Sequence, residues 1–486
     1  MEELEYHESV KQTELGLAPY AKRSIEACSP TFMGGVDVFS HFTKEWQGGN
    51  RLKYKHRTPI QLERDRVLYS HGMRKQTEKH HVLYSGQRRI VRAYATHTMK
   101  MAQVARAICR GLNLNQDFAE AIALGAKIGS VPFIHASKQV IGKWAEDKLT
   151  KNDKSLAPTN PISSGDKSQL SLTFDSSPMP GFVSRLESST VLDKVQKYMP
   201  WAAGHDDAKL YGSGQESYWL LCTNPFTNRG LKTAFSPETM YGVWRHTRGL
   251  RPGQNRFFHR CKLAETKNGF FEISDKNATF EAIIVQYADD ITWAIENLND
   301  ANTVSLLNGQ TSVYSNFRRE FESDDPFLSR ILNDFNSGDI YNYFISDFIK
   351  TSENMLSAYK KEALARTSLG EGNKDVMIRL SVEAEDVLEK IIKFLNEQIF
   401  TEPRTANRTE MLKNISSACI ELIHNSSDVL PKTIEDQAAL NNWSEETKKL
   451  ATKLLDDPVH KIQLSMDVLS SWGDQEIYDF VGIQSL

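Results

Sequence analysis

The sequence predicts a mostly α-helical fold with an irregular insert, and three observations support this prediction. Apolar residues recur at the spacing of an amphipathic helix in residues 101–112, 280–298 and 387–399. Strand signals are few and short, and GFFEIS at 269–274 is the clearest of them. The segment 149–181 is rich in Ser, Pro, Asn and Asp and has little periodicity. We therefore expect a helical body that is interrupted by an irregular insert, with few short strands.

The first amphipathic segment also indicates where its helix ends. Its apolar stripe comprises Met101, Val104, Ala105, Ile108 and Leu112. Gly111 and Asn113 then mark a helix end, because both residue types are common where a helix stops. Asn115 is predicted to cap the next helix, with Asp117 and Glu120 in its first turn.

The other two amphipathic segments extend this pattern into the second half of the chain. The stripe in 280–298 comprises Phe280, Ile283, Ile284, Tyr287, Ala288, Ile291, Ile295 and Leu298. The stripe in 387–399 comprises Val387, Leu388, Ile391, Ile392, Leu395 and Ile399. Stripes of this width are typical of helices that bury one face in a core.

The pattern divides the chain into four parts. Residues 1–148 and 216–310 are expected to form a helical core, with the irregular insert at 149–215 between them. Residues 311–486 are expected to form a C-terminal helical region that packs on this core.

Composition and charge limit the classes of function. Of the 486 residues 40% are hydrophobic, which suffices for a sizeable core, and the formal charge is only −3. The chain therefore has no overall electrostatic attraction to nucleic acid or membrane. The five cysteines are scattered and form no C-x-x-C pair, which favours a reducing compartment over a disulfide framework. Because no signal peptide and no apolar run of about 18 residues is visible, we expect a cytoplasmic protein without a membrane span.

Three stretches carry a family resemblance. They are RDRVLYSHGMRKQTEKHHV (64–82), THTMKMAQVARAICRGLNLNQDFAEAIALGAKIGSVPFIHA (96–136) and EAIIVQYADDITWAIENLNDA (281–301). In order and spacing they resemble the deoxyguanosine triphosphate triphosphohydrolase (dGTPase) family of the HD-domain superfamily. The resemblance implies an HD-domain-like helical bundle of the dNTP triphosphohydrolase type, often hexameric, that cuts dNTPs into deoxynucleoside and triphosphate.

The resemblance also implies where the reaction centre lies. Attack of water on a phosphate needs an activated hydroxide and neutralised phosphate oxygens, and a divalent ion held by imidazole and carboxylate supplies both. His97 matches the family's first metal histidine, and Asp289 matches its last metal aspartate. His135 matches the catalytic histidine. An active enzyme would use Mg²⁺ or Mn²⁺ here.

The family's central metal-binding pair is missing from this chain. Ala126 and Lys127 stand where the resemblance requires a His-Asp pair, and Lys138 stands in place of the catalytic Glu. His97 and Asp289 alone are too few ligands to hold such an ion firmly. We therefore expect no metal cofactor. We expect Lys127 to replace the ion, either by pairing with Asp289 or by binding phosphate directly.

The resemblance further implies nucleotide-binding positions, and several of them have changed. His81 stands where the family has a Gln that reads the sugar, and Glu296-Asn297 replaces a His-Asp pair. Arg245 matches a phosphate-binding Lys, and His246 follows it where the family often has Tyr. The candidate nucleotide- and phosphate-binding residues are therefore His81, Lys127, Lys138, Arg245, His246 and Asn297.

These residues leave three functions open, of which the first is favoured. The first is a pseudoenzyme that binds dNTPs without cutting them, as a nucleotide sensor or regulatory subunit. It would form a homo-oligomer such as a hexamer, or a hetero-oligomer with an active homologue. The second is an active but diverged dNTP triphosphohydrolase that uses His135, His97 and Asp289. The third is a binder of single-stranded nucleic acid, because the segment 244–262 interleaves six basic residues with aromatic ones and has no acid.

Overall fold

The computed structural model describes residues 57–81, 92–152, 279–307, 311–321, 337–363, 378–440, 445–456 and 458–482, a short stretch at 12–18 and a few isolated positions. Within these ranges every regular element is a helix, as the sequence predicted. The described residues make one isolated β-bridge, between His80 and Ala93. The strand signal at 269–274, the basic segment 244–262 and most of the insert lie outside the described residues. No helix in the described ranges is both long and apolar enough to cross a bilayer.

The helices follow one another along the chain in two groups. The first comprises α4 (Pro59–Leu68), α5 (His71–Lys75), the 3₁₀ turn η2 (Gln76–Glu78), α6 (Tyr94–Gly111), α7 (Gln116–Gly125) and α8 (His135–Asn152). The second comprises α13 (Phe280–Thr303), α14 (Ser312–Glu320), α16 (Ser337–Ala363), α18 (Val382–Phe394), the π turn η6 (Leu395–Ile399), α19 (Pro403–Asn425), α20 (Val429–Leu440), α21 (Glu445–Lys453), the 3₁₀ turn η7 (Leu454–Asp456), α22 (Pro458–Ser471) and α23 (Asp474–Val481).

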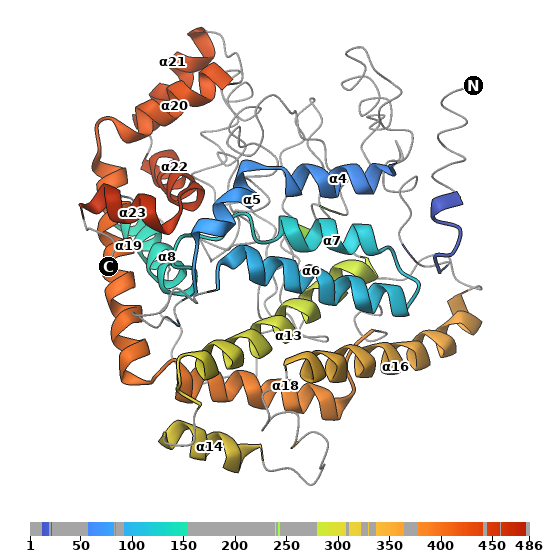
Figure 1. Ribbon diagram of the computed structural model, residues 1–486. Helices are drawn as coiled ribbons and strands as arrows, with labels where there is room; N and C mark the ends of the chain where they lie inside the picture. The colour runs from blue at the N-terminus through green and yellow to red at the C-terminus, as the bar shows by residue number, and fades with distance from the viewer. Residues whose placement is uncertain are drawn as a thin grey trace, which may run out of the picture.

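The helices α4, α7, α6 and α13 form a stack (Figure 1), and each contacts the next. The pair α16 and α18 lies beneath α13, and α16 also contacts α6. The long helix α19 runs across the ends of this stack, where α8, α22 and α23 pack against it. This arrangement brings α6, α7 and α13 together, although α13 follows the other two by more than a hundred residues in the sequence.

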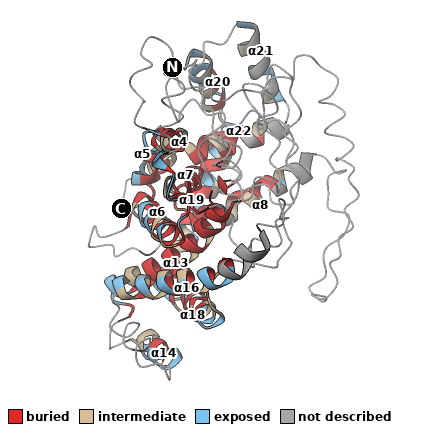
Figure 2. Ribbon diagram, turned by 90° about the vertical axis from the view of Figure 1, so that its right-hand side faces the viewer, coloured by how far each residue is buried: buried red, intermediate tan, exposed pale blue. Residues whose placement is uncertain are grey.

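The helix α13 is the central element of the core. It is buried on nearly all sides (Figure 2), because α6, α7, α16 and α18 all contact it. Its apolar positions, which the sequence predicted as a core stripe, include the fully buried Ile284, Ala288 and Ile291. Thr279 caps its N-terminus by accepting a hydrogen bond from the Ala282 amide at 3.1 Å.

The end of α6 and the start of α7 confirm the predicted helix boundaries. Asn113 adopts a left-handed backbone with φ of 55°, and the side chain of Asn115 accepts a hydrogen bond from the Phe118 amide. Gly111 lets α16 approach closely, because a Cβ added there would lie 2.5 Å from Cδ1 of Ile349.

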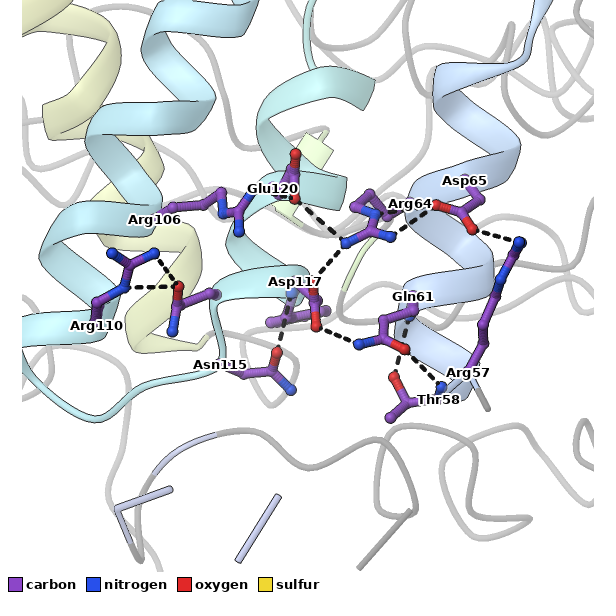
Figure 3. Close-up of polar contacts among 12 residues, drawn as sticks. Arg57, Thr58, Gln61, Arg64, Asp65, Arg106, Arg110, Asn115, Asp117 and Glu120 are labelled. Carbon is purple, nitrogen blue, oxygen red and sulfur yellow. Dashed lines mark hydrogen bonds and ion pairs between the residues drawn. The ribbon is translucent and has the colours of Figure 1, made fainter. Parts of the chain in front are cut away.

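A polar network ties α4 to α7 (Figure 3). The Arg64 guanidinium on α4 pairs with Asp117 at 2.5 Å and with Glu120 at 3.5 Å, and both carboxylates lie on α7. Arg106 of α6 pairs with the same Glu120 at 3.2 Å. The network therefore fixes the relative positions of α4, α6 and α7.

Candidate functional site

Three helices bring the central candidate residues together. His97 lies in the first turns of α6, Asp289 lies near the middle of α13, and Lys127 directly follows the C-cap residue of α7, Ala126. Because α6, α7 and α13 contact one another, residues far apart in the sequence meet at this point. The exposed fractions of the three side chains are 1% for His97, 6% for Lys127 and 7% for Asp289.

The Asp289 carboxylate bridges the other two side chains. Its Oδ1 lies 2.9 Å from Nε2 of His97, and its Oδ2 lies 2.8 Å from Nζ of Lys127. The sequence had left open whether Lys127 pairs with Asp289 or binds phosphate directly, and in this structure it pairs. An ammonium thus lies next to the carboxylate that the family resemblance assigns to a metal ion.

Two further rings surround this group. The Tyr94 ring stacks on His97 with an interplanar angle of 10° and centroids 5.5 Å apart. His81, a candidate nucleotide-binding residue, contacts both rings, at centroid distances of 5.3 and 5.5 Å. Nζ of Lys127 lies 5.9 Å from the Tyr94 ring centroid, within cation–π range. Sequence analysis missed Tyr94, although its place three residues before His97 puts both on one helix face.

Burial keeps the His97 imidazole neutral at physiological pH. Its pKa is lowered from 6.5 to about 4, chiefly by desolvation and also by the nearby charges of Arg92 and Lys127, against the opposing effect of Asp289. A neutral imidazole can bond to a carboxylate only by donating, so the shared proton lies on Nε2. Nδ1 of His97 is then an acceptor, and it is buried without a hydrogen-bond partner in the described part of the chain.

The side chains gathered here do not fit a divalent metal ion. Both oxygens of Asp289 already accept from N–H donors, and Nε2 of His97 carries a proton instead of a free lone pair. The Lys127 ammonium has no lone pair to offer. Among the described residues no three His, Cys, Asp or Glu side chains come close enough to one another to hold a metal.

Of the remaining candidate site residues, the structure describes the side chains of some and not of others. Lys138 lies half-buried in the first turn of α8, and its amide donates to the Ile134 carbonyl at 3.0 Å. Asn297 is buried on α13 and donates to the Trp293 carbonyl at 2.7 Å, within its own helix. His135 is the first residue of α8, but its side chain lies outside the described part. Arg245 and His246 also lie outside it.

A second buried polar cluster lies farther along α13, and of its members sequence analysis had singled out only Glu296. Its centre is Glu296, whose carboxylate accepts from Lys100 at 2.7 Å and from the Tyr341 hydroxyl at 3.0 Å. Arg92 pairs with Glu296 at 3.5 Å and with Asp300 at 3.0 Å. Burial raises the pKa of Asp300 to about 6. Glu296 therefore serves a structural network that joins α6, α13 and α16.

Comparison with known proteins gives one consistent similarity. No family model matches the chain. The chain is 35% identical over 119 residues to a deoxyguanosinetriphosphate triphosphohydrolase-like protein of Caldanaerobacter subterraneus, covering 24% of this chain and 35% of that protein. It is 22% identical to a protein of the same description from Wolinella succinogenes, over 78% of this chain and 87% of the relative. A third such protein, from Brucella ovis, is 37% identical over 91 residues, which cover 19% of this chain and 23% of that protein.

Proposed function

Because the chain belongs to the deoxyguanosine triphosphate triphosphohydrolase family, we propose that it binds the phosphates of deoxynucleoside triphosphates without hydrolysing them. It would act as a nucleotide sensor or as a regulatory subunit, alone in a homo-oligomer or together with an active homologue. Its relatives are named for hydrolysis of a deoxynucleoside triphosphate, and we therefore propose deoxynucleoside triphosphates as the ligand class.

The observation that carries the proposal is the ion pair between Lys127 and Asp289. A metal-dependent hydrolase needs a cation that coordinates water through its oxygen and so lowers the pKa of that water, and an ammonium cannot coordinate an oxygen in this way. At 2.8 Å from Asp289, Nζ of Lys127 supplies the positive charge without the open coordination positions. The scaffold thus keeps a cation at this point, and we propose that the hydrolytic chemistry is lost.

The same substitutions favour binding of an anion. Lys127 and Lys138 stand where the family resemblance places an Asp and a Glu, so two negative charges have become positive. Lys138 also lies in the first turn of α8, where the helix dipole favours negative charge. A triphosphate would therefore meet a more positive environment here than in a metal-free member of the family that keeps both carboxylates.

The test is to incubate the purified chain with each of the four dNTPs, first with Mg²⁺ or Mn²⁺ and then with EDTA. Triphosphate release and thermal shift are recorded in the same samples. We expect no triphosphate release and a nucleotide-induced stabilisation that persists in EDTA, since a ligand at 100 Kd adds about 2.7 kcal/mol of stability. Metal-dependent release of triphosphate would overturn the proposal.

A matched pair of variants locates the binding site. Lys138→Gln removes a charge from the first turn of α8, whereas Lys143→Gln removes the same charge from an exposed position of the same helix. We expect the nucleotide-induced shift to fall in the first variant and to remain in the second. Equal shifts in both variants would exclude Lys138 from the binding site.

A further inference from the structure

The loop 128–134 joins the end of α7 to the start of α8, so that Lys127 precedes it and His135 follows it. Most of its residues are buried. Its backbone is held by segments that are distant in the sequence. Gln76 donates to the Ile128 carbonyl at 3.2 Å, and Lys79 donates to the Ser130 carbonyl at 2.5 Å. The geometry of this loop therefore depends on side chains that the loop itself does not contain.

The end of the loop has a strained backbone. Phe133 and Ile134 have φ values of 54° and 43°, in the left-handed region. This region is unfavourable for L-residues other than glycine, and it is a genuine outlier for a β-branched residue such as Ile134. Such conformations persist only where the surrounding structure enforces them. Some contact must therefore hold the two residues that directly precede His135.

Asp474 supplies this contact from the far end of the chain. It is the first residue of α23, and its Oδ1 accepts from the Phe133 amide at 2.9 Å. Its Oδ2 accepts from the His80 amide at 2.9 Å and lies 3.0 Å from Nδ1 of the His80 ring. The carboxylate is nearly buried, and α23 adds a second contact because the Tyr478 ring lies 5.2 Å from the Phe133 ring.

Lys79 reinforces the same junction. Its side chain is fully buried, and its Nζ donates to the Ser470 carbonyl at 2.7 Å as well as to the Ser130 carbonyl. One ammonium thus bonds the end of α22 to loop 128–134. Next to it Lys75 pairs with Glu476 of α23 at 2.8 Å. Contacts of the Asp474, Lys79 and Lys75 side chains therefore join residues 75–80 and loop 128–134 to the segment 470–476.

We propose that Asp474 is the positioning residue for loop 128–134, so that the C-terminal helices α22 and α23 control the conformation of the loop that separates Lys127 from His135. Loss of the carboxylate would release the Phe133 amide and allow residues 133–134 to leave the left-handed region. The relevance of this control to nucleotide binding rests on the proposed function. The role of Asp474 in holding the loop does not.

Hydrogen–deuterium exchange of the full chain tests the proposal with two matched variants. Asp474→Asn keeps the size of the side chain but removes its charge and one of its two acceptors. Asp479→Asn makes the same change at an exposed position of the same helix. We expect exchange in peptides covering 128–134 to rise by about tenfold or more in the first variant and to stay unchanged in the second. Equal exchange in Asp474→Asn and the unaltered chain would overturn the proposal.

A measurement on the unaltered chain covers the case in which Asp474→Asn does not fold. Exchange is followed at low concentrations of urea, where local opening events can be separated. We expect peptides from 128–134 and from 468–480 to open together, with the same dependence on urea. Independent opening of loop 128–134 would overturn the proposal. If no dNTP stabilises the chain, the proposed function fails while the exchange data still decide the role of Asp474.

Discussion

At the scale of single residues, Lys127 and Asp289 illustrate how a buried charge becomes tolerable. Removing either charge from water is costly, and a close partner of opposite sign recovers much of that cost. The carboxylate gains a second partner in His97, whose imidazole remains neutral and donates a hydrogen bond from Nε2. Each of the three side chains therefore constrains the other two. A substitution of one of them is expected to alter the interaction between the two that remain.

Lys127→Met tests this coupling. The substitution leaves Asp289 buried without its ammonium, and we expect the free energy of unfolding to fall by about 3–5 kcal/mol. The double variant Lys127→Met/Asp289→Asn removes both charges and should recover a large part of this loss. Urea unfolding of both variants gives the values. A loss below about 0.5 kcal/mol for the single variant, as expected for an exposed lysine, would contradict the ion pair.

Lys79 provides a pH-dependent prediction. Its pKa is lowered from 10.5 to about 7, chiefly by burial and also by the charge of Lys75, against the opposing effects of Asp474, Glu476 and Glu78. Between these two pKa values the unfolded chain binds a proton that the folded chain does not, so this residue makes stability rise with pH from about 7 towards 10.5. Below pH 7 both states carry the proton, and the contribution of Lys79 is constant.

Lys79→Met removes this titration and serves as the reference. The free energies of unfolding of the two proteins are compared from pH 6 to pH 10. We expect the free energy of unfolding of the unaltered chain to rise relative to that of Lys79→Met as pH rises above 7. The reason is that only the unaltered chain has a buried ammonium whose deprotonation removes a desolvation penalty. A difference that stays constant over this range would show that Lys79 keeps its proton in the folded state.

At the scale of the elements, the ends of the helices follow from short-range chemistry. The cap at Asn115 and the helix end at Asn113 were predicted because each depends on its own residue type and its immediate neighbours. The core stripe of 280–298 was predicted for the same reason. The strained end of loop 128–134 was not predicted, because its cause is Asp474, which lies 341 positions beyond Phe133 in the sequence.

The cap of α13 tests an element-scale contribution on the helix that carries Asp289. Thr279→Ala removes the hydroxyl that accepts from the Ala282 amide, and we expect a loss of about 1 kcal/mol in the free energy of unfolding. Thr279→Ser retains the hydroxyl and should be close to neutral. If the two variants lose equal stability, the methyl group of Thr279 matters and its cap does not.

At the scale of the whole molecule, the family resemblance identified the positions that meet but not all of their partners. It predicted that His97, Asp289 and Lys127 share one site, because these positions correspond to the metal site of the family. Tyr94, Lys79 and Asp474 could not be found in this way. Their roles arise from the packing of α6, α7, α22 and α23, which one sequence without a three-dimensional arrangement does not contain.

The most direct test of the central claim, that Lys127 takes the place of a metal ion, is calorimetric titration with Mn²⁺. The unaltered chain is compared with the variant Ala126→His/Lys127→Asp, which restores the His-Asp pair of the family beside His97 and Asp289. We expect no Mn²⁺ uptake by the unaltered chain and stoichiometric uptake by the variant, since four donors replace two. Stoichiometric Mn²⁺ binding by the unaltered chain would contradict the claim.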